Sequence, residues 1–273
     1  MARVAICLYG LSQSLSDKVS INSENMTTNN KLSQTLITLS SFDSYEKNLD
    51  IGDNYDVFFH TWGEKNDLLL EKIKPKKYSF ENQKEFTPSA SVNSRYEEFL
   101  TPSLRKSDPN RLRNIYSRWY STLKSLEIKK EYELENEFKY DFVLLNRFDV
   151  TLHRVLNFQG LAEGFFYVSN WYSPSLSTNR FIRSLYYKTG IVLPVLRYHK
   201  PEIHGLKDFW FYGNSEDMDS FSKLYEKLND YLMHVKFSNH HLAYHHLKEI
   251  NLSNKMCYCF NDTRDYSLTR VLK

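Results

Sequence analysis

Glycine, proline and cysteine are all scarce in this chain of 273 residues, and each scarcity excludes a class of protein. Eight Gly and seven Pro are too few for a low-complexity chain or for a β-sandwich with many turns. Three Cys are too few for a disulfide scaffold. Cys7 falls in an expected first strand, and Cys257 and Cys259 fall in an expected last one, so we interpret them as reduced, buried thiols.

Other absences bear on location and partners. The sequence has no run of 18 apolar residues, and its beginning, "MARVAICLYG", lacks the long apolar stretch of a signal peptide. We therefore expect a soluble, cytoplasmic protein without a transmembrane segment. The net charge of +3 is too mild to indicate a nucleic-acid partner, and there is no basic helix or zinc-ligand spacing. A Gly-x-Gly-x-x-Gly motif is missing after the first expected strand, which disfavours a dinucleotide-dependent oxidoreductase.

Apolar segments of two kinds alternate along the chain and predict an α/β protein. Short apolar runs predict strands at 3–9, 55–62, 76–80, 164–172, 208–213 and 255–260, and one from 140 that ends abruptly at 146–149. Helical spacing predicts helices at 31–49, 110–136, 215–235 and 238–250. The segments 10–30 and 82–108 are expected to be irregular, and the second half of the 110–136 helix to be solvated. The alternation predicts a mostly parallel central sheet flanked by helices, in one domain over 1–273.

One expected strand ends in two charged residues. The stretch "YDFVLLNRFDVTL" delivers Arg147 and Asp149 to the end of an apolar run, and ligands of parallel sheets bind beyond the carboxyl ends of the strands. A guanidinium fork fits phosphate oxygens, and a carboxylate can hold Mg²⁺ or Mn²⁺ or accept from ribose hydroxyls. Residues two apart on a strand point the same way, so both can reach one ligand. A structural salt bridge at the strand end is the alternative.

Four stretches carry a resemblance to a known family. They are "RVAICLYGLSQS", "YDVFFHTW", "SRWYSTLKSLEIKKEYELENEFKYDFVLLNRFDV" and "DFWFYGNSEDMDSFSKLY". Together, and in this order, they resemble the GT-A glycosyltransferases, and more narrowly the small sugar transferases of bacterial capsule and lipopolysaccharide clusters, with relatives in large DNA viruses. The resemblance implies a GT-A-like, Rossmann-like fold. It also implies a glycosyltransferase that uses a nucleotide-sugar, expected to be a UDP-sugar, and a glycan or lipid-linked acceptor.

The resemblance also assigns the donor site. It places donor binding in residues 1–152 and acceptor binding in residues 153–273. The loop that follows Tyr9, with Gly10 and Ser12, would hold the base and ribose, and His60 and Trp62 would flank that pocket.

The diphosphate would lie at Arg147-Phe148-Asp149, where most members of the family carry an Asp-x-Asp motif that binds a divalent metal. Because Arg147 replaces the first acid, Mn²⁺ or Mg²⁺ is an open expectation. Arg147 can itself neutralise the diphosphate, or Asp149 can hold a metal. Arg118, in the preceding helix, could also reach the donor phosphates.

Other candidates concern the proton acceptor and further metal ligands. Asp208 matches the place where the family tends to put its catalytic base, although it can also be a solvent-facing strand residue. His241 and His245 are spaced i, i+4, so they share a helix face and are expected to ligate the donor metal, unless that face is simply polar or packs against the protein. Aromatic and basic residues from Arg180 to His199 would suit an acceptor with negative charge.

Two further possibilities stay open. A non-catalytic nucleotide- or carbohydrate-binding protein on the same fold is the alternative function. A homodimer is also possible, because many aromatic residues look exposed in the sequence.

Overall fold

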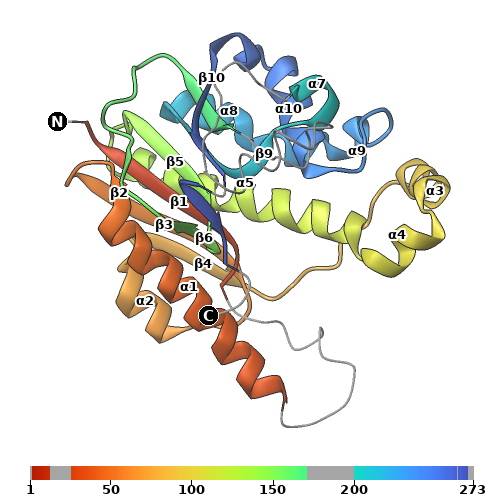
Figure 1. Ribbon diagram of the computed structural model, residues 1–273, viewed down its shortest axis with the longest axis horizontal. Helices are drawn as coiled ribbons and strands as arrows, with labels where there is room; N and C mark the ends of the chain where they lie inside the picture. The colour runs from red at the N-terminus through yellow and green to blue at the C-terminus, as the bar shows by residue number, and fades with distance from the viewer. Residues whose placement is uncertain (1, 13–25, 171–199, 263, 270–273) are drawn as a thin grey trace, which may run out of the picture.

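A seven-stranded, mostly parallel sheet forms the centre of the molecule (Figure 1). The computed structural model describes residues 2–12, 26–170, 200–262 and 264–269. The strands lie in the order β10-β8-β9-β5-β1-β3-β4. Their bounds are β1 Val4–Leu11, β3 Tyr55–Trp62, β4 Lys77–Glu81, β5 Phe142–Arg147, β8 Phe166–Asn170, β9 Lys207–Gly213 and β10 Met256–Asn261. Only β9 runs antiparallel to its neighbours in this sheet, β5 and β8.

Helices cover both faces of this sheet. α1 (Met26–Asn48) and α2 (Asp67–Ile73) lie on one face, and α5 (Arg111–Glu135), α8 (Ser215–Ser222) and α10 (Asn239–Glu249) lie on the other (Figure 1). Strand β1 shows why both faces must be covered. Ala5, Cys7 and Tyr9 join the core under α5, while Ile6 and Leu8 join the core under α1, because successive side chains point to opposite faces. The prediction of an α/β protein with a mostly parallel sheet flanked by helices is confirmed.

Short elements complete the fold. Two small sheets pair β2 (Leu49–Asp50) with β7 (Leu156–Asn157) and β6 (Val150–Leu152) with β11 (Tyr266–Leu268). The remaining helices are α3 (Ala90–Phe99), α4 (Pro102–Ser107), α7 (Pro201–His204) and α9 (Leu228–Tyr231), with 3₁₀ turns at Tyr225–Lys227 and Leu252–Lys255. None of the helices in the described part of the chain combines the length and apolar character needed to span a bilayer.

The prediction that segment 82–108 is irregular is wrong, because local capping builds two helices there. The Ser89 side chain accepts a hydrogen bond from the backbone N–H of Val92 and so begins α3. Thr101 caps Leu104 in the same way at the start of α4, with Pro102 in the first turn, where a missing N–H costs nothing.

One predicted strand ends where expected, and one predicted helix is shorter than expected. The strand predicted to end at 146–149 ends at Arg147, and the chain continues as β6 after a turn. The helix predicted over 215–235 ends at Ser222 and continues as a 3₁₀ turn and the short α9. Asn214 caps its start, because its side chain accepts a hydrogen bond from the Asp217 N–H at 2.8 Å.

The second half of α5 is mostly solvated as predicted, with Lys130, Glu131 and Glu135 exposed, but two of its charged residues are exceptions. Lys129 and Glu133 are fully buried there. The Lys129 ammonium donates to Ser215 Oγ at 2.6 Å, to Asp219 Oδ1 at 2.7 Å and to Glu133 Oε2 at 3.0 Å. This cluster joins α5 to α8, and each buried charge is compensated by a partner.

Candidate active site

A cleft of about 540 Å³ opens at the carboxyl edge of the central sheet. It lies where β1, β3 and β5 end side by side, because β1 pairs in parallel with both neighbours. The lining residues come from these strand ends, from the first half of α5 and from two later segments. They are Tyr9, Gly10, Leu11, Trp62, Asn114, Ser117, Arg118, Arg147, Phe148, Asp149, Asn239 and Thr269. Six residues predicted for the donor site, namely Tyr9, Gly10, Trp62, Arg118, Arg147 and Asp149, therefore line one cleft.

Arg147 and Asp149 form a bidentate ion pair on the wall of this cleft. Arg147 Nε lies 2.8 Å from Asp149 Oδ1, and Nη2 lies 2.7 Å from Oδ2. The two side chains are 27% and 18% exposed. Because the pair uses Nε and Nη2, the Nη1 donors of Arg147 lie outside it. The salt bridge named as the alternative is therefore present, and it borders a cleft.

Arg118 lies on the floor of the cleft and is held by several hydrogen bonds. Its Nε donates to Asp208 Oδ2 at 3.0 Å, and its Nη1 donates to Thr122 Oγ1 at 3.1 Å. Its Nη2 donates to Tyr9 Oη at 2.8 Å and to the Asp208 carbonyl at 2.9 Å, and its guanidinium carbon lies 3.5 Å from the centre of the Trp119 ring. These contacts fix the guanidinium in one orientation beneath the ligand space.

Asp208, the predicted catalytic base, lies beneath the cleft and is only 4% exposed. One carboxylate oxygen contacts Arg118, and the other lies 3.0 Å from His240 Nδ1. Burial by itself raises the pKa of Asp208, but His240, Arg118 and Arg147 together hold that pKa well below the usual range of an aspartate. Asp208 therefore has a low affinity for protons. Its ion pair orients the Arg118 guanidinium.

Trp62 borders the cleft but is only 1% exposed, and the remaining predicted donor residues, His60 and Ser12, lie behind the cleft. Trp62 stacks on Tyr120 with ring centres 5.4 Å apart. His60 is fully buried, and its Nδ1 lies 2.8 Å from Ser121 Oγ, which also accepts from the Gly10 N–H at 2.9 Å. Burial lowers the pKa of His60 to about 4, so the imidazole is neutral at pH 7.

Ser12 is likewise buried. Its N–H donates to Thr61 Oγ1 at 3.0 Å, and its hydroxyl lies 2.7 Å from the same oxygen. Ser12 and His60 are not lining residues of the cleft.

The predicted metal ligands Asp149, His241 and His245 are not brought together. His241 Nε2 lies 2.9 Å from the carbonyl oxygen of Ile203, in α7. His245 Nε2 lies 3.3 Å from His234 Nε2, in a different cavity. No group of three or more potential metal ligands occurs within the described ranges.

The cleft itself offers one carboxylate, Asp149, and two guanidinium groups among the described residues that line it. Both oxygens of that carboxylate already contact Arg147. A single carboxylate can hold Mn²⁺ or Mg²⁺ only together with ligand phosphates and water, so the metal stays a prediction. The two guanidinium groups fit an anion directly.

Several lining residues were missed by the sequence reasoning. Asn114 and Ser117 lie four and one positions before Arg118, so helical spacing alone places all three on one side of α5. Asn239 and Thr269 arrive from distant segments, and no local pattern marks them. The aromatic and basic segment from Arg180 to His199 lies outside the described residues.

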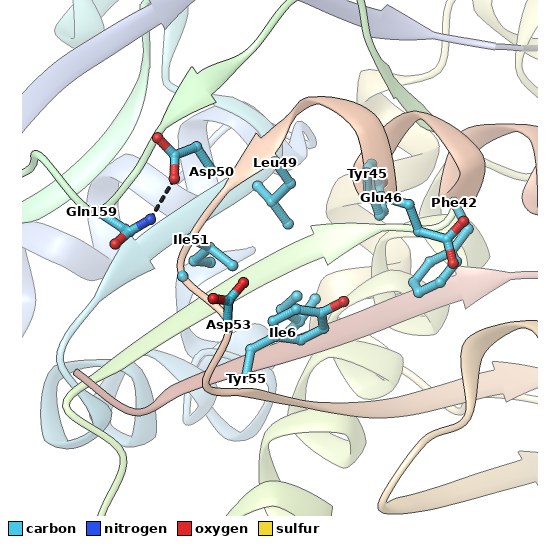
Figure 2. A pocket seen from close by; sticks show the side chains of 11 residues that line it. Ile6, Phe42, Tyr45, Glu46, Leu49, Asp50, Ile51, Asp53, Tyr55 and Gln159 are labelled. Atoms are coloured by element: carbon cyan, nitrogen blue, oxygen red, sulfur yellow. Dashed lines mark hydrogen bonds between the residues drawn. The ribbon is translucent and has the colours of Figure 1, made fainter. Parts of the chain in front are cut away.

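A second cavity of about 220 Å³ lies toward the opposite ends of the parallel strands (Figure 2). Figure 2 shows Ile6, Phe42 and Tyr55 at its base and acidic side chains around it. The acids Glu46, Asp50 and Asp53 all line it, and Asp50 accepts a hydrogen bond from Gln159. This cavity has acids where the larger cleft has arginines, so it does not suit a phosphate ligand.

No protein-family model and no curated protein matches this chain. The function proposed below therefore depends on the geometry and chemistry of the cleft.

Proposed function

We propose that this chain is a GT-A-type glycosyltransferase that transfers a sugar from a nucleotide-sugar to a glycan or lipid-linked acceptor, with a UDP-sugar as the first donor to test. The observation that carries the proposal is the pair Arg118 and Arg147 in a cleft at the carboxyl edge of a mostly parallel sheet. Such edges are where α/β sheets bind nucleotides. The Rossmann-like arrangement supports the proposal without distinguishing GT-A from other α/β families.

The arginines suit the diphosphate of such a donor. Each charge-assisted hydrogen bond to a phosphate oxygen contributes about 1.5–3 kcal/mol. Arg147 carries Nη1 donors outside its ion pair, and Arg118 is fixed beneath the same space. Trp62 also borders the cleft, but it is 1% exposed and packs on Tyr120, so it shapes the cleft without offering a free face. The positive charge of the arginines is therefore what matches a nucleotide diphosphate.

In the proposed reaction the donor diphosphate displaces the carboxylate of Asp149 from Arg147. A diphosphate oxygen takes the place of the carboxylate on Arg147, and Asp149 is released toward the acceptor. Asp149 then accepts the proton of the acceptor hydroxyl as the new bond from oxygen to the anomeric carbon forms. The bond from the anomeric carbon to the phosphate oxygen breaks, and Arg147 neutralises the charge of the leaving nucleoside diphosphate.

Asp208 has a positioning role in this proposal. It orients Arg118, and its buried ion pairs with Arg118 and His240 oppose proton uptake. A catalytic Asp208, as predicted from the resemblance, would first have to leave both partners. A role of Asp208 as the base stays a prediction, and it is separable from the role of Asp149 by substituting each residue to Asn.

A non-catalytic nucleotide-binding protein is the second candidate. One observation favours it, because the carboxylates of Asp149 and Asp208 are both held in ion pairs with arginine. Slow hydrolysis of a nucleotide-sugar without acceptor separates the two candidates, since a transferase activates the anomeric carbon and a binding protein does not.

A thermal-shift panel tests the proposal directly. Nucleoside mono- and diphosphates of uridine, guanosine and adenosine, and the matching nucleotide-sugars, are added with and without Mn²⁺. A ligand that binds only the folded state raises the melting temperature by mass action. We expect the diphosphates and nucleotide-sugars of one base to raise it even without Mn²⁺. If no nucleotide in the panel raises it under either condition, the proposed donor site is wrong.

A further inference from the structure

A separate cavity of about 560 Å³ lies on the flank formed by α8, α9 and α10, and it shares no lining residue with the active-site cleft. Two histidines from different segments line it. His245 lies in α10, and His234 follows α9. Their Nε2 atoms are 3.3 Å apart, and their ring centres are 5.0 Å apart. Two imidazole nitrogens therefore converge on one point at the protein surface.

This separation is the one that a shared zinc ion requires. Zinc binds imidazole nitrogen at about 2.0–2.1 Å in tetrahedral geometry, which places two such nitrogens roughly 3.3–3.4 Å apart. We propose that His234 and His245 form a two-histidine site for Zn²⁺ or a similar transition-metal ion. The remaining coordination positions fall to water, because no group of three or more protein ligands is assembled within the described residues.

The surroundings hold the two rings in place. The Tyr231 ring packs edge-on against His245, with centres 4.6 Å apart, and the Tyr231 hydroxyl lies 2.9 Å from His246 Nδ1. His246 Nε2 lies 3.2 Å from the Ser220 carbonyl, so both nitrogens of that third histidine already have partners. Only the other two histidines of this cavity direct nitrogens at each other.

The charges in the cavity are mixed and do not select a cation by themselves. Asp230 and Glu249 line it together with Lys223 and Lys227. Glu249 lies one helical turn after His245 and brings a carboxylate to the same side of α10. Selection therefore depends on the imidazoles, which favour Zn²⁺, Cu²⁺ and Ni²⁺ over Mg²⁺ or Ca²⁺.

The sequence alone points to a different chelating pair, and this difference makes the proposal testable. His241 and His245 are one helical turn apart, which is a common spacing for chelation. In the structure His241 contacts the Ile203 carbonyl, whereas His245 contacts His234. His241→Gln is therefore a matched control on the same helix.

The experiment is zinc titration by calorimetry on the full-length chain without an affinity tag, near pH 7.5. The variants are His234→Gln, His245→Gln and His241→Gln, each checked for folding by circular dichroism. We expect the unaltered chain and His241→Gln to bind one zinc ion. We expect His234→Gln and His245→Gln to bind it more than about tenfold more weakly, since even outer-shell ligand partners contribute that much. Binding should also be lost at pH 5, where imidazoles are protonated.

Three results would overturn the proposal. The first is that the unaltered chain binds no zinc at zinc concentrations well above that of the protein. The contact between His234 and His245 would then be only a hydrogen bond between two neutral rings. The second is loss of binding in His241→Gln with full retention in His234→Gln, which would assign the site to the helical pair. The third is unchanged binding in both His234→Gln and His245→Gln. Nucleotide binding in the cleft is expected to be the same in all variants, so each outcome is independent of the proposed function.

Discussion

The substitution Asp149→Asn separates two roles for the carboxylate on the cleft wall. If Asp149 holds a donor-bound metal, its loss weakens binding of a nucleoside diphosphate. If Asp149 instead competes with the diphosphate for Arg147, as proposed above, its loss strengthens that binding. The amide keeps the size of the side chain and removes its negative charge, so the two roles predict changes in Kd of opposite sign.

The ion-pair geometry sets the size of the expected change. Two hydrogen bonds of 2.8 and 2.7 Å join Arg147 to Asp149, but the side chains are 27% and 18% exposed. A pair of that exposure contributes at most about 1 kcal/mol after solvent screening. Relief of the competition should therefore tighten the Kd for the nucleoside diphosphate by up to about fivefold. Transfer should fall strongly, because the proposed proton acceptor is gone.

Arg147→Met provides the opposite change at the same site. It removes the guanidinium but keeps an unbranched side chain of similar length. Loss of one charge-assisted contact costs about 1.5–3 kcal/mol, which corresponds to a Kd weaker by about 10- to 150-fold. Calorimetry with the nucleoside diphosphate identified in the panel, without added metal, measures both variants. The double variant Asp149→Asn/Arg147→Met should resemble Arg147→Met, since the carboxylate acts through the arginine.

Two outcomes would refute this reasoning. Weaker diphosphate binding in Asp149→Asn that depends on Mn²⁺ would assign the carboxylate to a metal. Unchanged binding in both single variants would remove the pair from the donor site altogether, and the cleft would then have to serve another ligand.

Two further predictions concern stability. Lys129→Met removes the only fully buried cation next to Glu133 and leaves just the half-exposed Lys139, 3.5 Å away, so the free energy of unfolding in urea should fall by about 3–5 kcal/mol. Lys130→Met, on the exposed side of α5, should change it by less than about 0.5 kcal/mol, and equal effects would show that the cluster is not coupled to folding. Burial lowers the pKa of His60 and of His246 to about 4. Below pH 6.5 the unfolded chain therefore binds more protons at these imidazoles than the folded chain does. The free energy of unfolding that they contribute is fully present above pH 6.5 and is lost as the pH falls toward 4. Urea unfolding should show a loss of about 2 kcal/mol per imidazole between pH 7 and pH 5, and His60→Gln should remove about half of that dependence. A pH-independent stability over this range would mean that neither imidazole is kept neutral.

Much of the fold follows from local apolar patterns. Strand β3 occupies the eight residues of "YDVFFHTW", because a continuous apolar run with turn residues on both sides has few other stable conformations. Segment 82–108 was missed because its two helices are short and depend on caps at Ser89 and Thr101, which a search for long periodic faces overlooks. The end of β5 at Arg147 was predicted from the polar residues that follow the apolar run, but the pairing of β6 with β11 was not, because it joins residues more than 100 positions apart.

Only part of the candidate site could likewise be predicted from the sequence. Four residues that line the cleft were predicted, Arg147 and Asp149 from the end of an apolar strand, and Arg118 and Trp62 from the family resemblance. Asn239 and Thr269 were not, since tertiary folding alone brings them to the cleft. The metal prediction for His241 and His245 used helical spacing, which is a local rule. Their actual partners, Ile203 and His234, depend on how α7 and α9 pack against α10.

The end of β5 is held without help from the charges of Arg147 and Asp149. The Tyr45 hydroxyl donates to the Arg147 carbonyl at 3.0 Å and accepts from Asn146 Nδ2 at 2.9 Å. The Asn146 side chain also accepts from the Arg147 N–H at 2.9 Å. These neutral hydrogen bonds are buried or partly buried and fix the turn by themselves, whereas a partly exposed ion pair adds little to stability. The ion pair of Arg147 and Asp149 is thus expected to contribute little to folding, and this is why the proposed ligand role can be tested by substituting both residues.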